Sequence, residues 1–539
     1  MADLSDSTKK LINQYNLAKK QEVDKPSAPT IHVDEVAQKV AAFYEQIRTI
    51  VDWKEEHLMR RAAIIRKLKR KFFDLELNNF SGIENASESL IFELIRGGHF
   101  PNDKIEESKI SDVQKIINKY VFILKNNPES KAGKTGLNFY NWLIEVCACE
   151  IEETLAPSIR EMALIDYMFD AMKEKIKVSD KIYDVGLLKK EFTYVQIYIA
   201  VCQALFKLDK PMISYNLIKY RYPNWSKAGE QLISEISQKI FKIWQKTEED
   251  LANHILNKFY NICEKYDTPY LLMGDILSLN NGATETISDP SVLEGFIKTA
   301  YSKRLSTLKS RIARAAIYST ISIFVTKVLS LVLLEILIER IFFKENPSTM
   351  VLVSDVLIPT LLMFLIVASI RRPSKKNLNL VTMETIKIAY KKEKTDVYEV
   401  KMGRKKGFIM KTVLSLIYVA SACITFGAIY YALNYFNFPI TSIVIDIIFI
   451  AVILFAGTAL SKRAQELTME EEKEGFLGFL ADVFFLPVQG LGRWISNKWK
   501  RYNALAALFN ALIDMPFSAF VEFLEKWRYF IKERKEEIR

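Results

Sequence analysis

The sequence predicts an all-α protein that combines a large helical cytoplasmic domain, about four transmembrane helices in two hairpins, and amphipathic C-terminal helices. Long apolar runs are confined to residues 315–460, whereas the first 310 residues carry charges throughout. Half of all residues are hydrophobic and 26% are charged, which fits a chain with both soluble and membrane parts. The 18 Gly and 15 Pro are few for 539 residues, and this favours long helices over an all-β fold.

The N-terminal part predicts a flexible tail followed by a helical domain. Residues 1–30 are polar, and Pro26 and Pro29 interrupt regular structure, so we expect a flexible N-terminal tail. Residues 31–310 predict the helical cytoplasmic domain. Its first long helix is expected from about Val33 to Phe73, where apolar residues recur at spacings of three, four and seven. Such a thin apolar stripe is typical of helices that pair as a coiled coil.

Four apolar stretches predict the membrane part. They are Ala315–Ile338, Val351–Ile370, Val413–Phe436 and Ile443–Leu460. Each is near the roughly 20 residues that a helix needs to cross a bilayer. A soluble core rarely contains helices that are apolar on all faces, and four in succession make that reading untenable. We therefore expect a first transmembrane hairpin over residues 315–370 and a second over residues 411–462.

The distribution of Lys and Arg predicts the orientation of these hairpins. Basic residues gather before the first span, after the second, before the third and after the fourth. They are Lys303, Arg304, Lys309, Arg311, Arg314, Arg371, Arg372, Lys375, Lys376, Arg404, Lys405, Lys406, Lys462 and Arg463. Basic loops stay on the cytoplasmic side of a membrane, so both termini are expected in the cytoplasm, with the protein in the cell (inner) membrane.

Two further segments on that side have their own patterns. Residues 371–410 form a basic cytoplasmic linker, in which residues 385–390 and 396–400 alternate polar and apolar side chains and predict a β-hairpin. Residues 463–539 predict an amphipathic, membrane-associated C-terminal region. Its short apolar segment is expected to end at Pro487, and its last helix is expected to begin at Asp514. That helix lies either on the membrane or against the soluble domain.

Tryptophans alternate with basic residues shortly after Pro487. The net charge of the chain is +11, and most of the basic excess flanks apolar segments, which favours anionic lipid headgroups over nucleic acid as a partner. Trp beside Lys and Arg suits the headgroup layer. The residues expected to contact lipid are Arg493, Trp494, Lys498, Trp499, Lys500 and Arg501.

The charged residues inside the apolar stretches include Lys327, Asp355 and Asp446. At a rise of about 1.5 Å per residue, all three lie roughly 20–24 Å from the basic ends of their spans. A lysine and two aspartates at one depth can neutralise each other between helices. Charges in a bilayer are costly and usually face a helix bundle or a wet cavity. The trio therefore predicts an intramembrane ion cluster, which is either structural or part of an ion or proton path.

Motifs of common enzymes and metal sites do not emerge from the sequence. Residues 132–135 end like a phosphate-binding loop, but Pro128 stands where that loop needs its first Gly. The four histidines form no zinc motif, and Cys147 and Cys149 face apart on a helix, which favours buried thiols. We expect no catalytic residue, no cofactor and no bound metal.

Two parts of the chain carry a resemblance to known proteins. The stretch Ile31 to Lys71, with VDWKEEHLMRRAAIIRKLKRK, resembles the opening of uncharacterised multi-pass membrane proteins of bacteria, as do the Leu-Pro and Gly-Arg-Trp patterns near Pro487 and Arg493. The resemblance covers the two ends of the chain. It implies a bacterial inner membrane and carries no activity, cofactor or site residue with it.

These observations lead to two functional hypotheses. The first is a membrane scaffold or interaction protein without enzymatic activity, whose helical cytoplasmic domain binds a protein partner or self-associates. The second is an oligomeric ion or proton channel or transporter that uses Lys327, Asp355 and Asp446.

Overall fold

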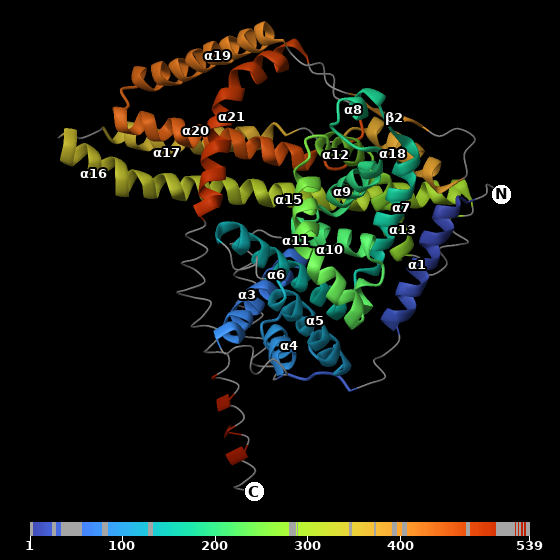
Figure 1. Ribbon diagram of the computed structural model, residues 1–539. Helices are drawn as coiled ribbons and strands as arrows, with labels where there is room; N and C mark the ends of the chain where they lie inside the picture. The colour runs from blue at the N-terminus through green and yellow to red at the C-terminus, as the bar shows by residue number, and fades with distance from the viewer. Residues whose placement is uncertain are drawn as a thin grey trace. The chain divides into compact units, whose positions relative to one another are not determined.

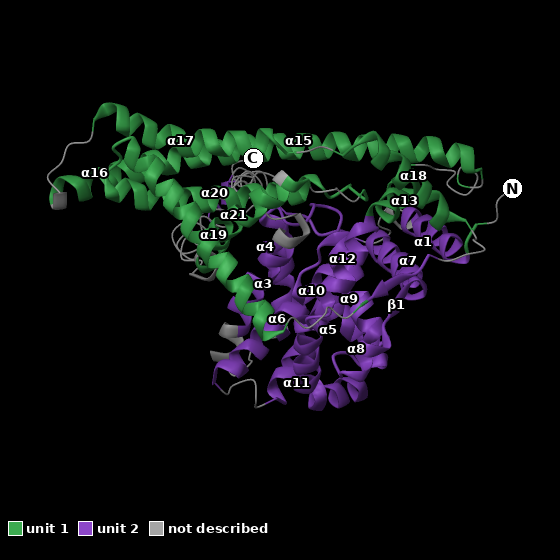
Figure 2. Cartoon of the chain, turned by 90° about the horizontal axis from the view of Figure 1, so that it is seen from above, with its two compact units in different colours: residues 1–5, 268–393, 401–504 green, residues 6–267, 394–400, 505–539 purple. Residues whose placement is uncertain are grey.

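Helices form nearly all of the regular structure, which confirms the all-α class (Figure 1). The computed structural model describes residues 4–23, 29–33, 56–77, 85–127, 133–279, 287, 289–343, 348–370, 373–390, 396–401, 407–470, 475–502 and single positions between 523 and 534. The chain forms two compact units (Figure 2). Residues 1–5, 268–393 and 401–504 form what we call the membrane unit, and residues 6–267, 394–400 and 505–539 form the helical unit.

The helical unit is built from helices, and the apolar faces of α3, α4, α5, α6, α10 and α11 meet in a common core. The helices are α1 Asp6–Val23, α3 Glu56–Leu77, α4 Ala86–Arg96, α5 Ser108–Lys125, α6 Gly133–Leu155, α7 Ile159–Lys175, α8 Asp180–Asp184, η3 Lys190–Phe192, α9 Thr193–Phe206, α10 Lys210–Arg221, η4 Trp225–Lys227, α11 Glu230–Ala252 and α12 Leu256–Lys265. Leu90, Phe139 and Ile240, from α4, α6 and α11, are completely buried in this core. The first stretch of this unit runs to residue 267, and residues 268–393 belong to the membrane unit.

Buried ion pairs cross the core of the helical unit. Lys119 Nζ on α5 donates a hydrogen bond to Glu150 Oε1 on α6 at 2.6 Å and another to the Trp225 carbonyl at 3.1 Å. Arg61 Nε on α3 donates to Glu152 Oε2 at 2.8 Å. Each buried charge thus has an opposite charge within hydrogen-bond distance, as the cost of removing it from water requires.

The N-terminal segment differs from the flexible tail that its polarity predicts. Asp6–Val23 forms α1, which packs against α7. Leu11, Ile12 and Tyr15 are buried on its inner face, so a short apolar stripe outweighs the polar composition. The long helix predicted from Val33 is described only from Glu56, as α3, and its earlier part lies outside the described residues.

Among the residues that the structure describes, the membrane unit contains four helices that are long and apolar enough to cross a membrane: residues 290–341, α17, α19 and α20. Its elements are α13 Asp267–Leu279, α15 Pro290–Ser330, a π-helix Leu331–Glu335, α16 Ile336–Ile338, a second π-helix Glu339–Phe343, α17 Thr349–Ala368, α18 Lys375–Ala389, α19 Phe408–Tyr435, α20 Ile440–Ala464 and α21 Phe476–Tyr502. The first apolar helix is therefore much longer than the predicted span, because it begins well before the apolar run.

The linker after α17 does not form the predicted β-hairpin. Thr385–Ala389 belongs to α18, where Val381, Thr385 and Ile388 are buried at helical spacing. The second expected strand does form, as β2 Tyr398–Val400, but it pairs in parallel with β1 Ile176–Val178 of the helical unit. The alternating pattern was too short to distinguish a helix from a strand in the first segment.

The C-terminal region also differs from expectation. The helix α21 continues through Pro487 instead of ending there, and it packs against α19 and α20 of the membrane unit. In Figure 1 it crosses α20. The helix predicted from Asp514 lies outside the described residues.

Candidate functional site

A cluster of charged side chains is buried where the apolar helices meet. Lys327 lies near the C-terminal end of α15, Asp355 lies in the second turn of α17, and Asp446 lies in the second turn of α20. Lys327 and Asp446 are fully buried, and Asp355 is 1% exposed. The structure therefore places the three sequence-predicted charges together, from three different helices.

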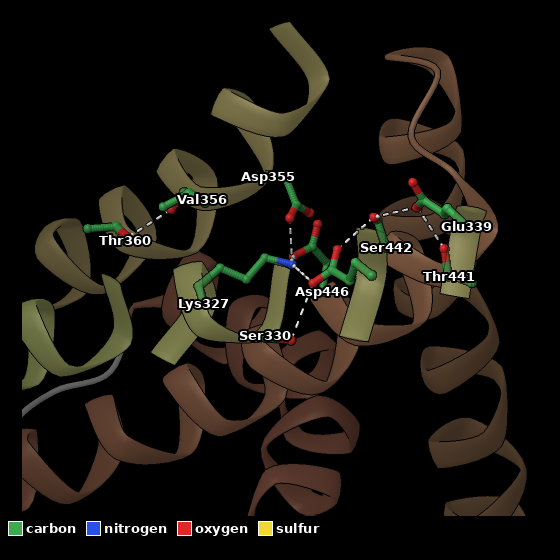
Figure 3. Close-up of polar contacts among 10 residues, drawn as sticks. Lys327, Ser330, Glu339, Asp355, Val356, Thr360, Thr441, Ser442 and Asp446 are labelled. Carbon is green, nitrogen blue, oxygen red and sulfur yellow. Dashed lines mark hydrogen bonds and ion pairs between the residues drawn. The ribbon is translucent and has the colours of Figure 1, made fainter. Parts of the chain in front are cut away.

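The lysine ammonium lies at the centre of this cluster (Figure 3). Lys327 Nζ is 2.8 Å from Asp355 Oδ2 and 2.9 Å from Asp446 Oδ1. It is also 2.8 Å from Glu335 Oε1, to which it donates a hydrogen bond. We call these four residues the acid–lysine cluster.

Glu335 is a member of the cluster that sequence reasoning missed. On a regular helix with 3.6 residues per turn, a residue eight positions after Lys327 faces another direction. Leu331–Glu335 is instead a π-helix, whose wider turns rotate the chain less per residue and return Glu335 to the face of Lys327. The sequence does show Glu335 as a carboxylate within an apolar run. Regular helical spacing, however, does not place it on the same face as Lys327.

Hydroxyl groups of Ser330, Thr441 and Ser442 lie beside carboxyl groups in and next to the cluster. Ser442 Oγ donates a hydrogen bond to Glu335 Oε2 at 2.6 Å and lies 3.4 Å from Glu339 Oε1. Thr441 Oγ1 donates to the same Glu339 oxygen at 2.8 Å. Ser330 Oγ lies 3.3 Å from Glu335 Oε1 on the other side. Glu339 is 2% exposed, so a fourth buried carboxylate adjoins the cluster.

The cluster contains more acid than base. One ammonium group contacts three carboxyl groups, those of Glu335, Asp355 and Asp446. Asp355 Oδ1 and Asp446 Oδ2 are buried and accept no hydrogen bond from the residues that the structure describes. A buried carboxylate oxygen without a donor strongly favours a proton or a cation beside it.

The expected lipid-contact residues lie on α21. Arg493, Trp494 and Lys498 are exposed, whereas the side chains of Trp499, Lys500 and Arg501 lie outside the described part of the chain. Gly492 on the same helix is pressed against the Ala451 carbonyl, halfway along α20. Thr425 Oγ1 of α19 donates a hydrogen bond to the Phe484 carbonyl at 2.9 Å. The helix is thus part of the packing among the apolar helices.

The thiols in the described part of the helical unit are not reactive groups. Burial raises the pKa of the Cys202 thiol to about 12 and moves those of Cys147 and Cys149 well above their usual value, so these thiols stay protonated and inert. Across the described residues, no group of three or more His, Cys, Asp or Glu side chains is arranged to hold a metal ion.

No protein-family model, curated protein or solved structure matches this chain. The resemblance to bacterial multi-pass membrane proteins therefore stays an expectation from the sequence, and functional argument rests on the geometry of the site itself.

Proposed function

We propose that this chain is an integral membrane protein that moves protons through its acid–lysine cluster, as a proton channel or a proton-coupled transporter. One observation carries the proposal: three buried carboxyl groups surround a single ammonium, and two of their oxygens have no donor among the described residues. A purely structural ion pair needs one acid for one base. The additional acids give the site a capacity to take up and release protons.

The energetics of burial favour protonation of such a site. With all four side chains charged, the cluster would carry a net charge of −2 in an environment without water. Two unit charges 4 Å apart interact by about 4 kcal/mol even at an effective dielectric constant of 20. Binding a proton to one of the aspartates removes part of this repulsion and supplies the missing donor, so the proton count responds to the surroundings.

A proton fits this site better than a metal ion. Lys327 Nζ occupies the centre of the carboxylates, which is the position that a bound metal ion would take. A tethered ammonium can stay there while protons come and go on the carboxylates around it. A metal ion would have to displace the ammonium first.

Contacts on one side of the membrane unit support the two-hairpin topology. The buried side chain of Asn377, just after the second span, donates hydrogen bonds to the Tyr301 hydroxyl at 2.8 Å and to the Leu467 carbonyl at 2.7 Å. Tyr301 precedes the apolar part of the first span, and Leu467 follows the fourth. Three ends of the apolar helices thus meet at one point, and these ends carry the basic residues that favour the cytoplasm.

The parallel strand pair supports the same orientation. β2 lies between the second and third spans in the sequence, yet it pairs with β1 of the helical unit. Backbone hydrogen bonds cannot connect strands across a bilayer, so this linker and the helical unit share a side. We therefore propose that the helical unit and the linker are cytoplasmic, with the exposed Arg493 and Lys498 reaching towards anionic lipid headgroups.

A scaffold or interaction role is a second proposal, for the helical unit. β2 pairs with β1 of the helical unit and stands only a few residues before α19 in the sequence. A protein bound to the helical unit would therefore be linked to α19 through a short segment of the chain. Cross-linked pull-down and blue-native electrophoresis test this role. A partnerless monomer in both measurements would contradict it.

Proton movement can be measured directly. Protein in liposomes with an entrapped pH-sensitive dye is driven by a valinomycin-clamped potassium gradient. We expect a proton flux that is lost with Asp446→Asn or Asp355→Asn and kept with Asp482→Asn, because Asp482 is an exposed acid on α21, outside the cluster. A flux no greater than that of protein-free liposomes, or one unchanged in all three variants, would overturn the proposal.

A further inference from the structure

A chain of hydrogen-bonding groups continues from the acid–lysine cluster along the first span. Ser442 Oγ lies between two carboxyl groups, 2.6 Å from Glu335 Oε2 and 3.4 Å from Glu339 Oε1. All three side chains are at least 97% buried. Lys327, Glu335, Ser442 and Glu339 therefore form one continuous polar line through an otherwise apolar bundle. Figure 3 shows Lys327, Ser442 and Glu339 of this line.

The two π-helices set up this line. Glu335 ends the first π-helix and Glu339 begins the second, with α16 between them. Residues four apart on one helix lie on the same face, so both glutamates point to the start of α20, where Ser442 lies in the first turn. Two buried acids in adjacent turns of an apolar span are costly, and such residues usually mark ion or proton paths.

The line has a direction along the helices. Lys327, Glu335 and Glu339 follow one another towards the connection between the first span and α17, and Ser442 lies near the α19–α20 turn. Both connections are on the side opposite the basic ends that meet at Asn377. The line thus leads from the cluster to the non-cytoplasmic end of the membrane unit.

We propose that Glu335, Ser442 and Glu339 form a proton relay between the acid–lysine cluster and the non-cytoplasmic side, with Glu339 as the group that exchanges protons at that end. This inference rests on the proposed proton movement. The step is balanced: protonated Glu335 gives its proton to Ser442 Oγ, while the Ser442 hydroxyl proton passes to Glu339 Oε1. Glu335 is left as a carboxylate, Glu339 becomes neutral, and rotation of the Ser442 hydroxyl resets the relay.

A purely structural role for Glu339 is the competing explanation. Its carboxyl group lies beside the first turn of α20, where a negative charge is stabilised by the helix dipole. A structural Glu339 would affect stability but would not depend on the Ser442 hydroxyl for proton transfer. Variants that remove only the Ser442 hydroxyl therefore distinguish a relay role of Glu339 from a structural one.

The test compares matched hydroxyl deletions on the two sides of Glu335. Ser442→Ala breaks the relay, whereas Ser330→Ala removes a hydroxyl from the other Glu335 oxygen and serves as the control. We expect liposome proton flux to fall about a hundredfold in Ser442→Ala and Glu339→Gln, the scale of losing a positioned proton carrier. Ser442→Thr, which keeps the hydroxyl, should restore the flux. Ser330→Ala leaves the path from Glu335 to Glu339 intact and should reduce the flux far less than Ser442→Ala.

A second measurement decides the relay independently of net transport. Time-resolved infrared spectroscopy after a pH jump follows the carboxylic acid bands of the folded protein in detergent. We expect slower equilibration of these bands in Ser442→Ala than in Ser330→Ala. Equal rates in the two variants would overturn the relay, whatever the flux. A wild-type protein without flux but with slowed bands in Ser442→Ala would instead overturn the transport function and leave the relay in place.

Discussion

At Lys327, one ammonium group holds together segments from different parts of the chain. Its contacts reach a π-helix eight residues away, α17 and α20. The Phe449 ring adds a weaker cation–π contact, with Nζ 5.5 Å from its centroid. The same ammonium group supplies the positive charge for all three carboxylates. Its removal therefore affects every helix that meets at the site.

The Lys327→Met variant should be strongly destabilised, since it leaves buried carboxylates without their counter-ion. Breaking such a pair from one side costs about 3–5 kcal/mol. Combining it with Asp446→Asn should restore part of the loss, because the second substitution removes one uncompensated charge. A thermal-stability cycle in detergent over both residues measures this coupling. Strictly additive effects would show that Lys327 and Asp446 do not interact.

Glu145 offers a pH-dependent test in the helical unit. Burial, followed by the nearby Asp209 and Glu248, raises the pKa of this carboxyl group despite the opposing charge of Lys69. A carboxyl with a raised folded pKa favours folding at low pH, and this contribution is lost as the pH rises through that pKa. Glu145→Gln should thus stabilise the protein at pH 7.5, with the gain shrinking as the pH falls through the raised pKa of Glu145 towards the usual range of a carboxyl group. A gain of equal size at every pH would contradict this assignment.

The sequence predicted Lys327, Asp355 and Asp446 as neighbours because the rise of an α-helix is regular, so counting residues from the basic ends measures depth. It could not predict Glu335, because a π-helix changes the rotation of the chain and leaves no mark in apolar periodicity. The parallel pairing of β2 with β1 could not be predicted from the sequence either. Three-residue strands far apart in the sequence carry no signal of their partner.

At the scale of elements, α21 behaves as part of the bundle although its composition is that of a surface helix. Gly492 allows its backbone to approach the Ala451 carbonyl and Phe455 of α20, and Gly490 lies beside the Tyr418 hydroxyl of α19. A glycine at a helix crossing permits the close approach that small residues provide in membrane proteins. The two glycines therefore explain how α21 packs closely against α19 and α20.

Gly492→Ala should separate α21 from α20, because a Cβ atom at this position would collide with backbone and not with a movable side chain. Overpacking of this kind costs about 1–3 kcal/mol. Gly478→Ala is the matched control on the same helix, since a Cβ there meets nothing within 4 Å. The control should be neutral or stabilising through its higher helix propensity. Equal thermal stability of the two variants in detergent would refute the close crossing.

On the scale of the whole molecule, the two units are joined by more than one passage of the chain. The helical unit contains residues 394–400, and the membrane unit contains residues 1–5, where Leu4 pairs with Tyr390. Every one of these passages involves segments that we place on the cytoplasmic side. If one span were oriented differently, the partners of the Leu4–Tyr390 pair or of the β1–β2 pair would lie on opposite sides of the membrane. A measurement of one loop therefore tests the orientation of all four spans.

Cysteine labelling measures that orientation. In a Cys423→Ser background, the remaining native cysteines are buried. A cysteine at Ser348 or Asn437, in the connections within each hairpin, should react with an impermeant maleimide added outside intact cells. One at Asn379, on the exposed side of α18, should react only after the membrane is opened. Labelling of Asn379 from outside would overturn the two-hairpin arrangement.

The order of the cluster residues along the chain bears on how the protein is made. In the proposed topology, Lys327, Glu335 and Asp355 leave the ribosome before Asp446, so the first hairpin would enter the membrane with an internal counter-ion for its charges. α20 then arrives with Asp446 in its second turn; an aspartate at the centre of a span costs about 2.5–3.5 kcal/mol to insert, which is an upper limit for this position. The ammonium that offsets this cost is already in the bilayer. In that topology, insertion of the second hairpin depends on the presence of the first, and we expect a Lys327→Met chain to insert its fourth span less efficiently than the unsubstituted chain.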